Sequence, residues 1–124
     1  MTIEPVARRE ELAGLRVLVL GANGFIGRHV TRGASEAGAS VTATHRRPLS
    51  EDARVPGVDY RRLDVRSQQD WDAAMAWVRD TWGGLDLLVN NAGVATGGRI
   101  DVESMSDWER VVDINLLGVA RGCH

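Results

Sequence analysis

Short segments that contain apolar and β-branched residues alternate with longer amphipathic segments along the chain. Residues 17–20 and 85–90 are mostly apolar, whereas residues 40–44 and 58–63 also include polar or charged positions. Segment 17–20 is too short for a helix and rich in β-branched residues, which favours a buried parallel strand. We predict strands over residues 17–20, 40–44, 58–63 and 85–90. Segment 85–90 is nearly all apolar, which is typical of a central strand.

Two amphipathic segments have helical spacing. The first predicted helix covers residues 25–37 and ends before Gly38, and the second begins after the N-cap Ser67 and ends at Gly83. Their buried faces are predicted to contain Ile26, Val30 and Ala34 in the first helix, and Trp71, Met75, Val78 and Trp82 in the second.

A last helix is predicted to begin at the capping box Ser106–Glu109. Its apolar stripe is predicted to contain Trp108, Val111, Val112 and Leu116. Asn115 lies on the same side as Val111 and Val112, so we expect a buried amide that must find hydrogen-bond partners.

The order of these elements predicts the fold class. A strand–helix–strand unit is followed by a strand, a helix, a strand and a helix, which predicts an α/β, Rossmann-like, doubly wound parallel sheet. Right-handed crossovers place the strands in the order 3-2-1-4, with flanking helices. We expect residues 1–14 to be a flexible lead-in and residues 15–124 to be the N-terminal portion of the domain.

Composition limits the classes of function. The chain has 124 residues, 44% of them apolar, which suffices for one domain with a core. A net charge of −2 gives no signal for nucleic acid or a membrane surface, and no segment of 18 apolar residues occurs. A single cysteine, Cys123, fits a cytoplasmic protein. The acids Asp101, Glu103 and Asp107 lie near a helix start, where they complement the helix dipole, so no metal site is predicted.

Three glycines follow the first strand at intervals of three residues: Gly21, Gly24 and Gly27. Such a turn permits a positive φ and brings the backbone close to a phosphate, and a helix starting near Gly24 directs free N–H groups to the same place. We therefore predict a pyrophosphate site lined by Gly21, Asn23, Gly24, Phe25, Ile26 and Gly27. The alternative is a turn that serves packing only.

The segment after the second strand, Thr44–Pro48, contains no carboxylate but has Arg46 and Arg47. A carboxylate there would accept from a ribose 2′-hydroxyl, whereas guanidinium groups match a 2′-phosphate. The segment thus predicts a preference for NADP(H) over NAD(H). The alternative is a pair of solvated arginines at the start of a loop.

From residue 16 onward the sequence resembles the short-chain dehydrogenase/reductase family. Four motifs occur in the family's order: the glycine turn 21–27, Leu63-Asp64-Val65, Asn90-Asn91-Ala92-Gly93, and Asp113-Ile114-Asn115-Leu116. The glycine spacing and Leu20 depart from the common single-domain branch, which has a threonine before the first glycine and closer second and third glycines. The glycine spacing resembles that of the branch with longer members.

The resemblance implies roles for further residues. It places Asp64 and Val65 at the adenine, and Asn91, Ala92 and Gly93 at the ribose next to the nicotinamide. His45 stands where NAD-preferring members carry an aspartate, and Arg46 where NADP-preferring members often carry an arginine. Asn115 corresponds to a residue that helps position a water molecule of the proton relay, which is a supporting catalytic role.

Family members transfer a hydride between a nicotinamide cofactor and a carbonyl or alcohol substrate, using a serine and a Tyr–Lys pair. A tyrosine has an ordinary pKa of about 10, so proton transfer near neutral pH needs a neighbouring cation. Here the one tyrosine, Tyr60, starts a strand, and the chain contains no lysine. We expect the catalytic residues and the later strands to lie outside this chain.

Three interpretations remain open from the sequence. The chain is part of an oxidoreductase, a nucleotide-binding module that acts alone, or a half-enzyme completed by another subunit. Without later strands the fourth strand would be an apolar edge, which predicts self-association or a homo-oligomer.

Overall fold

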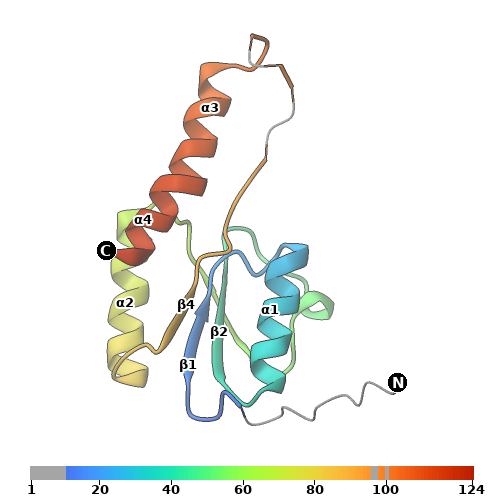
Figure 1. The fold of residues 1–124 in the computed structure, drawn as a ribbon. Coiled ribbons are helices and arrows are strands. Elements are labelled where there is room, and N and C mark those ends of the chain that lie inside the picture. Colours follow the sequence, from blue (N-terminus) through green and yellow to red (C-terminus); the bar gives the residue numbers. More distant parts are fainter. Residues whose placement is uncertain (1–10, 96–97, 100) are drawn as a thin grey trace.

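Four parallel strands form one sheet in the order β3-β2-β1-β4, as predicted (Figure 1). The computed structural model describes residues 11–95, 98–99 and 101–124. The strands are β1 (Arg16–Val19), β2 (Ser40–His45), β3 (Asp59–Arg62) and β4 (Leu87–Val89). Residues 11–14 form a turn, and the rest of the predicted lead-in lies outside the described residues.

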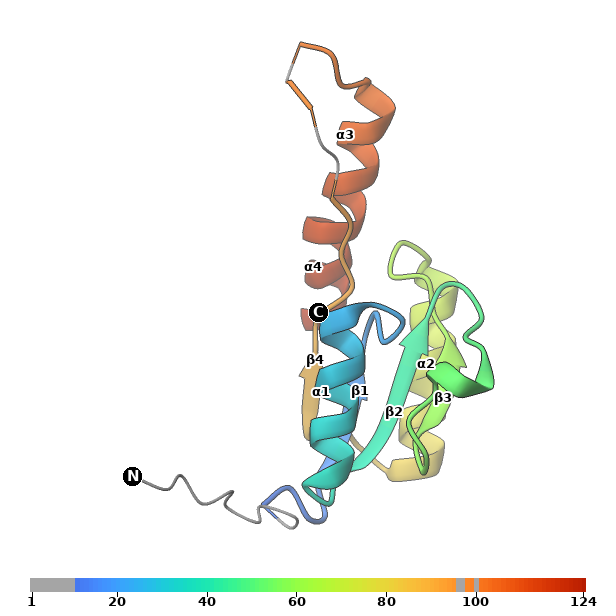
Figure 2. The same cartoon turned by 90° about the vertical axis from the view of Figure 1, so that its right-hand side faces the viewer.

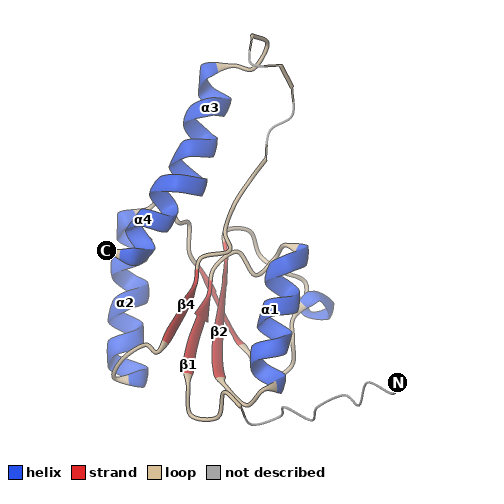
Figure 3. Cartoon of the chain, viewed as in Figure 1, coloured by secondary structure: helices blue, strands red, loops and turns tan. Residues whose placement is uncertain are grey.

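Helices flank the sheet on both sides (Figures 1 and 3). They are α1 (Phe25–Glu36), the short 3₁₀ turn η1 (Glu51–Ala53), α2 (Gln68–Trp82), α3 (Met105–Val112), the π-helical turn η2 (Asp113–Leu117) and α4 (Gly118–Cys123). α1 covers one face, and α2 and α4 lie on the other. α3 projects beyond the carboxyl ends of the strands (Figure 2). No helix in the described part of the chain is long and apolar enough to span a bilayer.

The alternation of side chains along the strands divides the core into two layers. The layer toward α2 contains Leu18, Leu20, Leu63, Val65, Trp71 and Ile114. The layer toward α1 contains Val17, Val19, Ala34 and Val41. Because Leu63, Val65 and Ile114 belong to one layer, the segment after β3 and the turn η2 are held together just beyond the strand ends.

Helix α2 begins and ends where the sequence predicts. The Ser67 hydroxyl accepts from the Asp70 backbone N–H at 3.1 Å, and Gly83 takes a left-handed conformation with φ of 74°. The last helix begins earlier than predicted, because Ser104 rather than Ser106 is its N-cap. The Ser104 hydroxyl accepts from the Asp107 N–H at 3.2 Å, and Ser106 lies within the first helical turn.

The predicted helical stripes are partly wrong. Trp71 and Val78 are buried, but Ile26 is 65% exposed and Met75 is 38% exposed. In helix α1 the predicted Ala34 is buried and Val30 is half-buried against the core, and Gly27 and Thr31 are buried as well. Small side chains let this helix approach the sheet closely, which rotates Ile26 away from the core. Among the described residues no layer covers α3, so the predicted stripe residues Trp108, Val112 and Leu116 are exposed.

Strand β4 lies at the edge of the described sheet, where it pairs with β1 alone. Its first residue, Leu87, is 43% exposed. An aliphatic edge strand of this kind is open to pairing with a further strand.

Candidate functional site

A cleft of about 550 Å³ opens at the carboxyl edge of the sheet. Its lining comes from the segments that follow all four strands: residues 21, 23–27, 46–47, 63–65 and 91–94, joined by Arg110 and Ile114. Ligands of open α/β sheets bind at this edge, beside the point where the strand order reverses. The structure thus brings together every predicted cofactor residue except His45.

At two of the three glycines, close packing leaves no space for a side chain. Gly21 has a φ of +69°, and a Cβ there would lie 2.7 Å from the Cα of Ala92. A Cβ on Gly27 would collide with the carbonyl oxygen of Gly21 and lie 2.7 Å from Nδ2 of Asn91. Asn91 Nδ2 donates to that same carbonyl oxygen at 3.0 Å. These contacts clamp the glycine turn between α1 and the segment after β4.

Gly24 has no comparable packing constraint. The nearest atom to a Cβ at this position is the Gly21 carbonyl oxygen, at 3.8 Å. Gly24 is the N-cap of α1, no side chain caps this helix, and its first turn carries no acidic residue. The first backbone N–H groups of a helix have no intrahelical partner, so those of α1 are available to an anion in the cleft.

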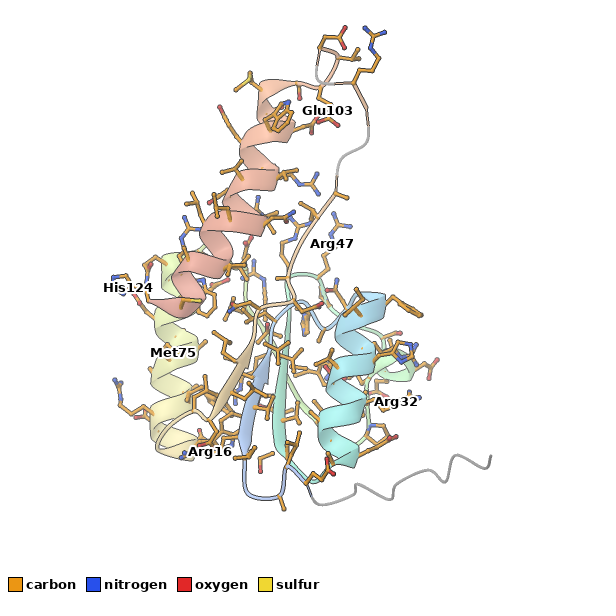
Figure 4. All side chains as sticks on the ribbon, in the orientation of Figure 1. Arg16, Arg32, Arg47, Met75, Glu103 and His124 are labelled. Atoms are coloured by element: carbon orange, nitrogen blue, oxygen red, sulfur yellow. The ribbon has the colours of Figure 1, made fainter. Side chains whose placement is uncertain are left out.

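Arg46 and Arg47 line the cleft immediately after β2. Figure 4 shows Arg47 in the space between α3 and α1. Among the described residues, no carboxylate forms a salt bridge with either guanidinium. The charge of Arg46 also lowers the pKa of Asp64, but that carboxylate is already paired with Arg66. The excess of positive charge beside the glycine turn favours a ligand with more than one negative charge.

His45, expected near the cofactor ribose, is only 7% exposed and does not line the cleft. Burial lowers the pKa of its imidazole, and the positive charges of Arg54 and Arg62 lower it further. Its Nδ1 is buried without a hydrogen-bond partner in the described structure. The His45 side chain therefore lies in the interior of the protein and not in the cleft.

Several side chains form hydrogen bonds with the Asp64–Val65 segment. The Asp64 carboxylate accepts two bonds from the Arg66 guanidinium, at 2.8 and 3.0 Å, and this pairing lowers the pKa of Asp64. The Val65 carbonyl accepts from Trp71 Nε1 at 2.9 Å and from Arg121 Nη1 at 3.3 Å. Both α2 and α4 thus fix the backbone of this side of the cleft.

Asn115 is exposed, so the expectation of a buried amide is wrong. Its expected hydrogen bonds do exist, because Oδ1 accepts from the Val94 N–H at 2.8 Å and Nδ2 donates to the Val94 carbonyl at 2.7 Å. Asn115 lies in the π-helical turn η2, a local irregularity often found at functional sites. The pair of bonds holds the segment after β4, while Asn115 itself does not line the cleft.

Four lining residues lie outside the predicted set: Leu63, Val94, Arg110 and Ile114. Leu63 and Ile114 belong to motifs already recognised, and Val94 directly follows one. No motif marks Arg110, and the available signal is its position four residues before Ile114, on the same helical face.

The comparisons with known proteins agree with this geometry. A model of the short chain dehydrogenase family matches residues 16–124. The 3beta-hydroxysteroid dehydrogenase 1 of Eggerthella lenta is 32% identical over 92% of this chain and 47% of its own length. The NADP-dependent 3-hydroxy acid dehydrogenase YdfG of Shigella flexneri is 36% identical over 83% of this chain and 44% of its own length.

The fold is shared with solved members as well. The ligand-free aldohexose dehydrogenase of Thermoplasma acidophilum superposes with a TM-score of 0.81 at 28% identity, covering 90% of this chain and 42% of that protein. The chain spans about half the length of the curated relatives it matches. With the family match, the ordered motifs and the cleft at the strand ends in agreement, the chain belongs to the short-chain dehydrogenase family of NAD(P)-dependent oxidoreductases.

Proposed function

We propose that this chain is the dinucleotide-binding half of an oxidoreductase that transfers hydride between NADP(H) and a small carbonyl or alcohol substrate. The observation that carries the proposal is the convergence of the glycine turn, the arginine pair, Asp64–Val65 and Asn91–Gly93 on one cleft. The matched relatives are dehydrogenases by name, which supports an oxidoreductase over a binding module that acts alone.

The residues of the cleft fit a nicotinamide dinucleotide. The open space at Gly24 and the uncapped start of α1 suit the pyrophosphate. Asp64 and Val65 would hold the adenine, and the segment 91–93 would hold the ribose next to the nicotinamide. When bound, the reduced cofactor supplies the hydride. Asn115 holds the Val94 backbone beside this segment.

The remaining catalytic groups would come from polypeptide outside this chain. A serine, a tyrosine and a lysine are the groups that the family uses for proton transfer, and this chain has no lysine. The active site would therefore be complete only when the second half of the domain packs against β4. We place the protein in the cytoplasm, since its single cysteine requires no oxidising compartment.

The preference for NADP(H) rests on charge at the end of β2. Arg46 and Arg47 face the cleft without a salt bridge to any carboxylate among the described residues, and the buried His45 offers no acceptor for a ribose hydroxyl there. A 2′-phosphate would supply the missing negative charge. One matched relative is NADP-dependent by name, which supports this preference.

The test is the substitution Arg46→Asp, measured by titrating tryptophan fluorescence with NADPH and with NADH. A charge-assisted hydrogen bond contributes about 1.5–3 kcal/mol, so we expect NADPH binding to weaken by about ten- to a hundredfold while NADH binding is kept or improved. Arg32→Asp on α1, outside the cleft, is the matched control. An unchanged ratio of the two affinities in Arg46→Asp refutes the NADP(H) assignment.

We also propose that the chain self-associates. The exposed Leu87 on the edge strand β4 and the exposed apolar side chains of α3 leave a large surface unpaired among the described residues. Sedimentation at micromolar concentration should show species heavier than one chain, and a purely monomeric distribution contradicts the proposal.

A further inference from the structure

We infer that Arg110 of α3 is a third guanidinium of the cofactor cleft, contacting the 2′-phosphate of NADP(H) together with Arg46 and Arg47. This inference rests on the proposed NADP(H) site and names an additional residue that determines its specificity. Arg110 belongs to none of the motifs that identify the family, and it comes from an element about sixty residues beyond the arginine pair.

The position of Arg110 is set by the residue one helical turn later. Ile114 is 6% exposed and packs in the same core layer as Leu63 and Val65. Side chains four apart lie on one face of a helix, so burying Ile114 turns Arg110 toward the cleft. Both residues accordingly line the cleft with the segment 63–65.

Positively charged side chains outnumber acidic ones in the lining of the cleft, and Arg110 has no salt bridge among the described residues. Three arginines and one aspartate line the cleft, and the Asp64 carboxylate is already engaged by Arg66. Arg110 forms no salt bridge or side-chain hydrogen bond with any other described residue. Among the described residues none of the three guanidiniums forms a salt bridge, and the one lining carboxylate, Asp64, is paired with Arg66 although the charge of Arg46 also lowers its pKa. The cleft therefore carries an excess of positive charge, which matches a multiply charged anion.

A structural role at a helix end does not account for Arg110. An arginine in a last turn can interact with free carbonyl groups. However, α3 continues directly into η2 and then α4, up to Cys123, so the helical carbonyls near Arg110 are not at a terminus.

The adenosine end is the part of the cofactor that Arg110 can reach. The pyrophosphate is assigned to the glycine turn and the N-terminus of α1, whereas Arg110 lies one helical turn before Ile114, which packs with Leu63 and Val65. The 2′-phosphate lies on the adenosine ribose, so a guanidinium beside the adenine segment and two guanidiniums after β2 would meet at this group.

The test isolates the 2′-phosphate with two small probes that differ only in this group. Isothermal titration calorimetry on the full-length native polypeptide compares adenosine 2′,5′-bisphosphate with adenosine 5′-monophosphate. We expect Arg110→Gln to weaken binding of the bisphosphate about tenfold and binding of the monophosphate less than about twofold. Arg32→Gln is the matched control, because Arg32 is exposed on α1 and lies outside the cleft (Figure 4). It should leave both affinities unchanged.

The outcomes distinguish this inference from the proposed function. Equal weakening of both probes would mean that Arg110 acts on the base, the ribose or the 5′-phosphate, which the probes share, and overturns the inference, as does an unchanged affinity for the bisphosphate. If the unsubstituted protein does not prefer the bisphosphate to the monophosphate, the proposed NADP(H) site itself fails. If Arg110→Gln unfolds, Arg110→Lys, which keeps the charge but not the planar fork, should weaken the bisphosphate alone by a few-fold. No weakening in that variant overturns the inference.

Discussion

The contact between the glycine turn and helix α1 can be tested with two glycines of the same helix. Gly27 and Gly33 both lie in α1, but their surroundings differ completely. A Cβ on Gly27 would collide with the Gly21 carbonyl oxygen and lie 2.7 Å from Asn91 Nδ2, whereas a Cβ on Gly33 meets nothing within 4 Å. We expect Gly27→Ala to destabilise the protein and Gly33→Ala to stabilise it.

The magnitude follows from three terms. An alanine in place of a helical glycine gains about 0.5–1 kcal/mol, and this gain is common to both variants. The extra methyl group at Gly27 costs about 1–3 kcal/mol through overpacking. Displacing Asn91 from the Gly21 carbonyl costs about 1 kcal/mol more. The shared gain cancels, so the two variants should differ in free energy of unfolding by about 2–4 kcal/mol.

Urea denaturation followed by circular dichroism measures this difference directly. Gly33→Ala should raise the midpoint and Gly27→Ala should lower it, with similar slopes if both unfold in two states. Gly24→Ala gives a second comparison, since the nearest atom to its Cβ is 3.8 Å away. It should cost no more than about 1 kcal/mol through the weaker N-cap. Equal midpoints for Gly27→Ala and Gly33→Ala would refute the clamp between the turn and the helix.

Two further substitutions test contacts that hold the sheet, one beside the cleft and one at the opposite edge of the sheet. Trp71→Phe removes the donor that reaches the Val65 carbonyl at 2.9 Å from a side chain that is 3% exposed, so it should cost about 1–3 kcal/mol in urea unfolding; an unchanged midpoint contradicts this. The Arg16 guanidinium lowers the pKa of Asp86 to about 2, from an ordinary 3.8. The stability from this pair is present above pH 3.8 and is lost as the pH falls toward 2. Arg16→Gln should therefore lower the thermal midpoint at neutral pH and flatten its acid dependence, whereas a parallel shift at every pH disproves the pairing.

Features that depend on neighbours in the chain follow from the sequence. The four strands form at the predicted segments, because strand propensity acts within a few residues. The preference for right-handed crossovers then orders them, because handedness acts within one crossover. The cap at Ser67 and the stop at Gly83 are likewise local. The shift of the last N-cap from Ser106 to Ser104 shows the limit, since both serines have plausible spacing and the backbone conformation selects one.

The motifs in the sequence identify most of the backbone segments that line the cleft. Residues that follow parallel strands meet at one edge of a sheet, so the glycine turn, the arginine pair and the segments 63–65 and 91–93 can be brought together from their order alone. Their order does not determine the direction of individual side chains. His45 and Arg46 are adjacent in sequence, but His45 is the last residue of β2 and is buried, whereas Arg46 lies in the bend after the strand and lines the cleft.

Tertiary structure decided the rotation of each helix about its own axis. A sequence shows several apolar residues at helical spacing, but only contact with the sheet selects the buried ones, and here Gly27 and Ala34 are buried while Ile26 is exposed. In helix α3, likewise, the burial of Ile114 one turn later sets the rotation that brings Arg110 to the cleft. The sequence by itself thus determined the family, the strand order and the backbone segments of the site. Packing between distant segments determined which side chains face the cleft, because burial energy depends on partners that local sequence does not specify.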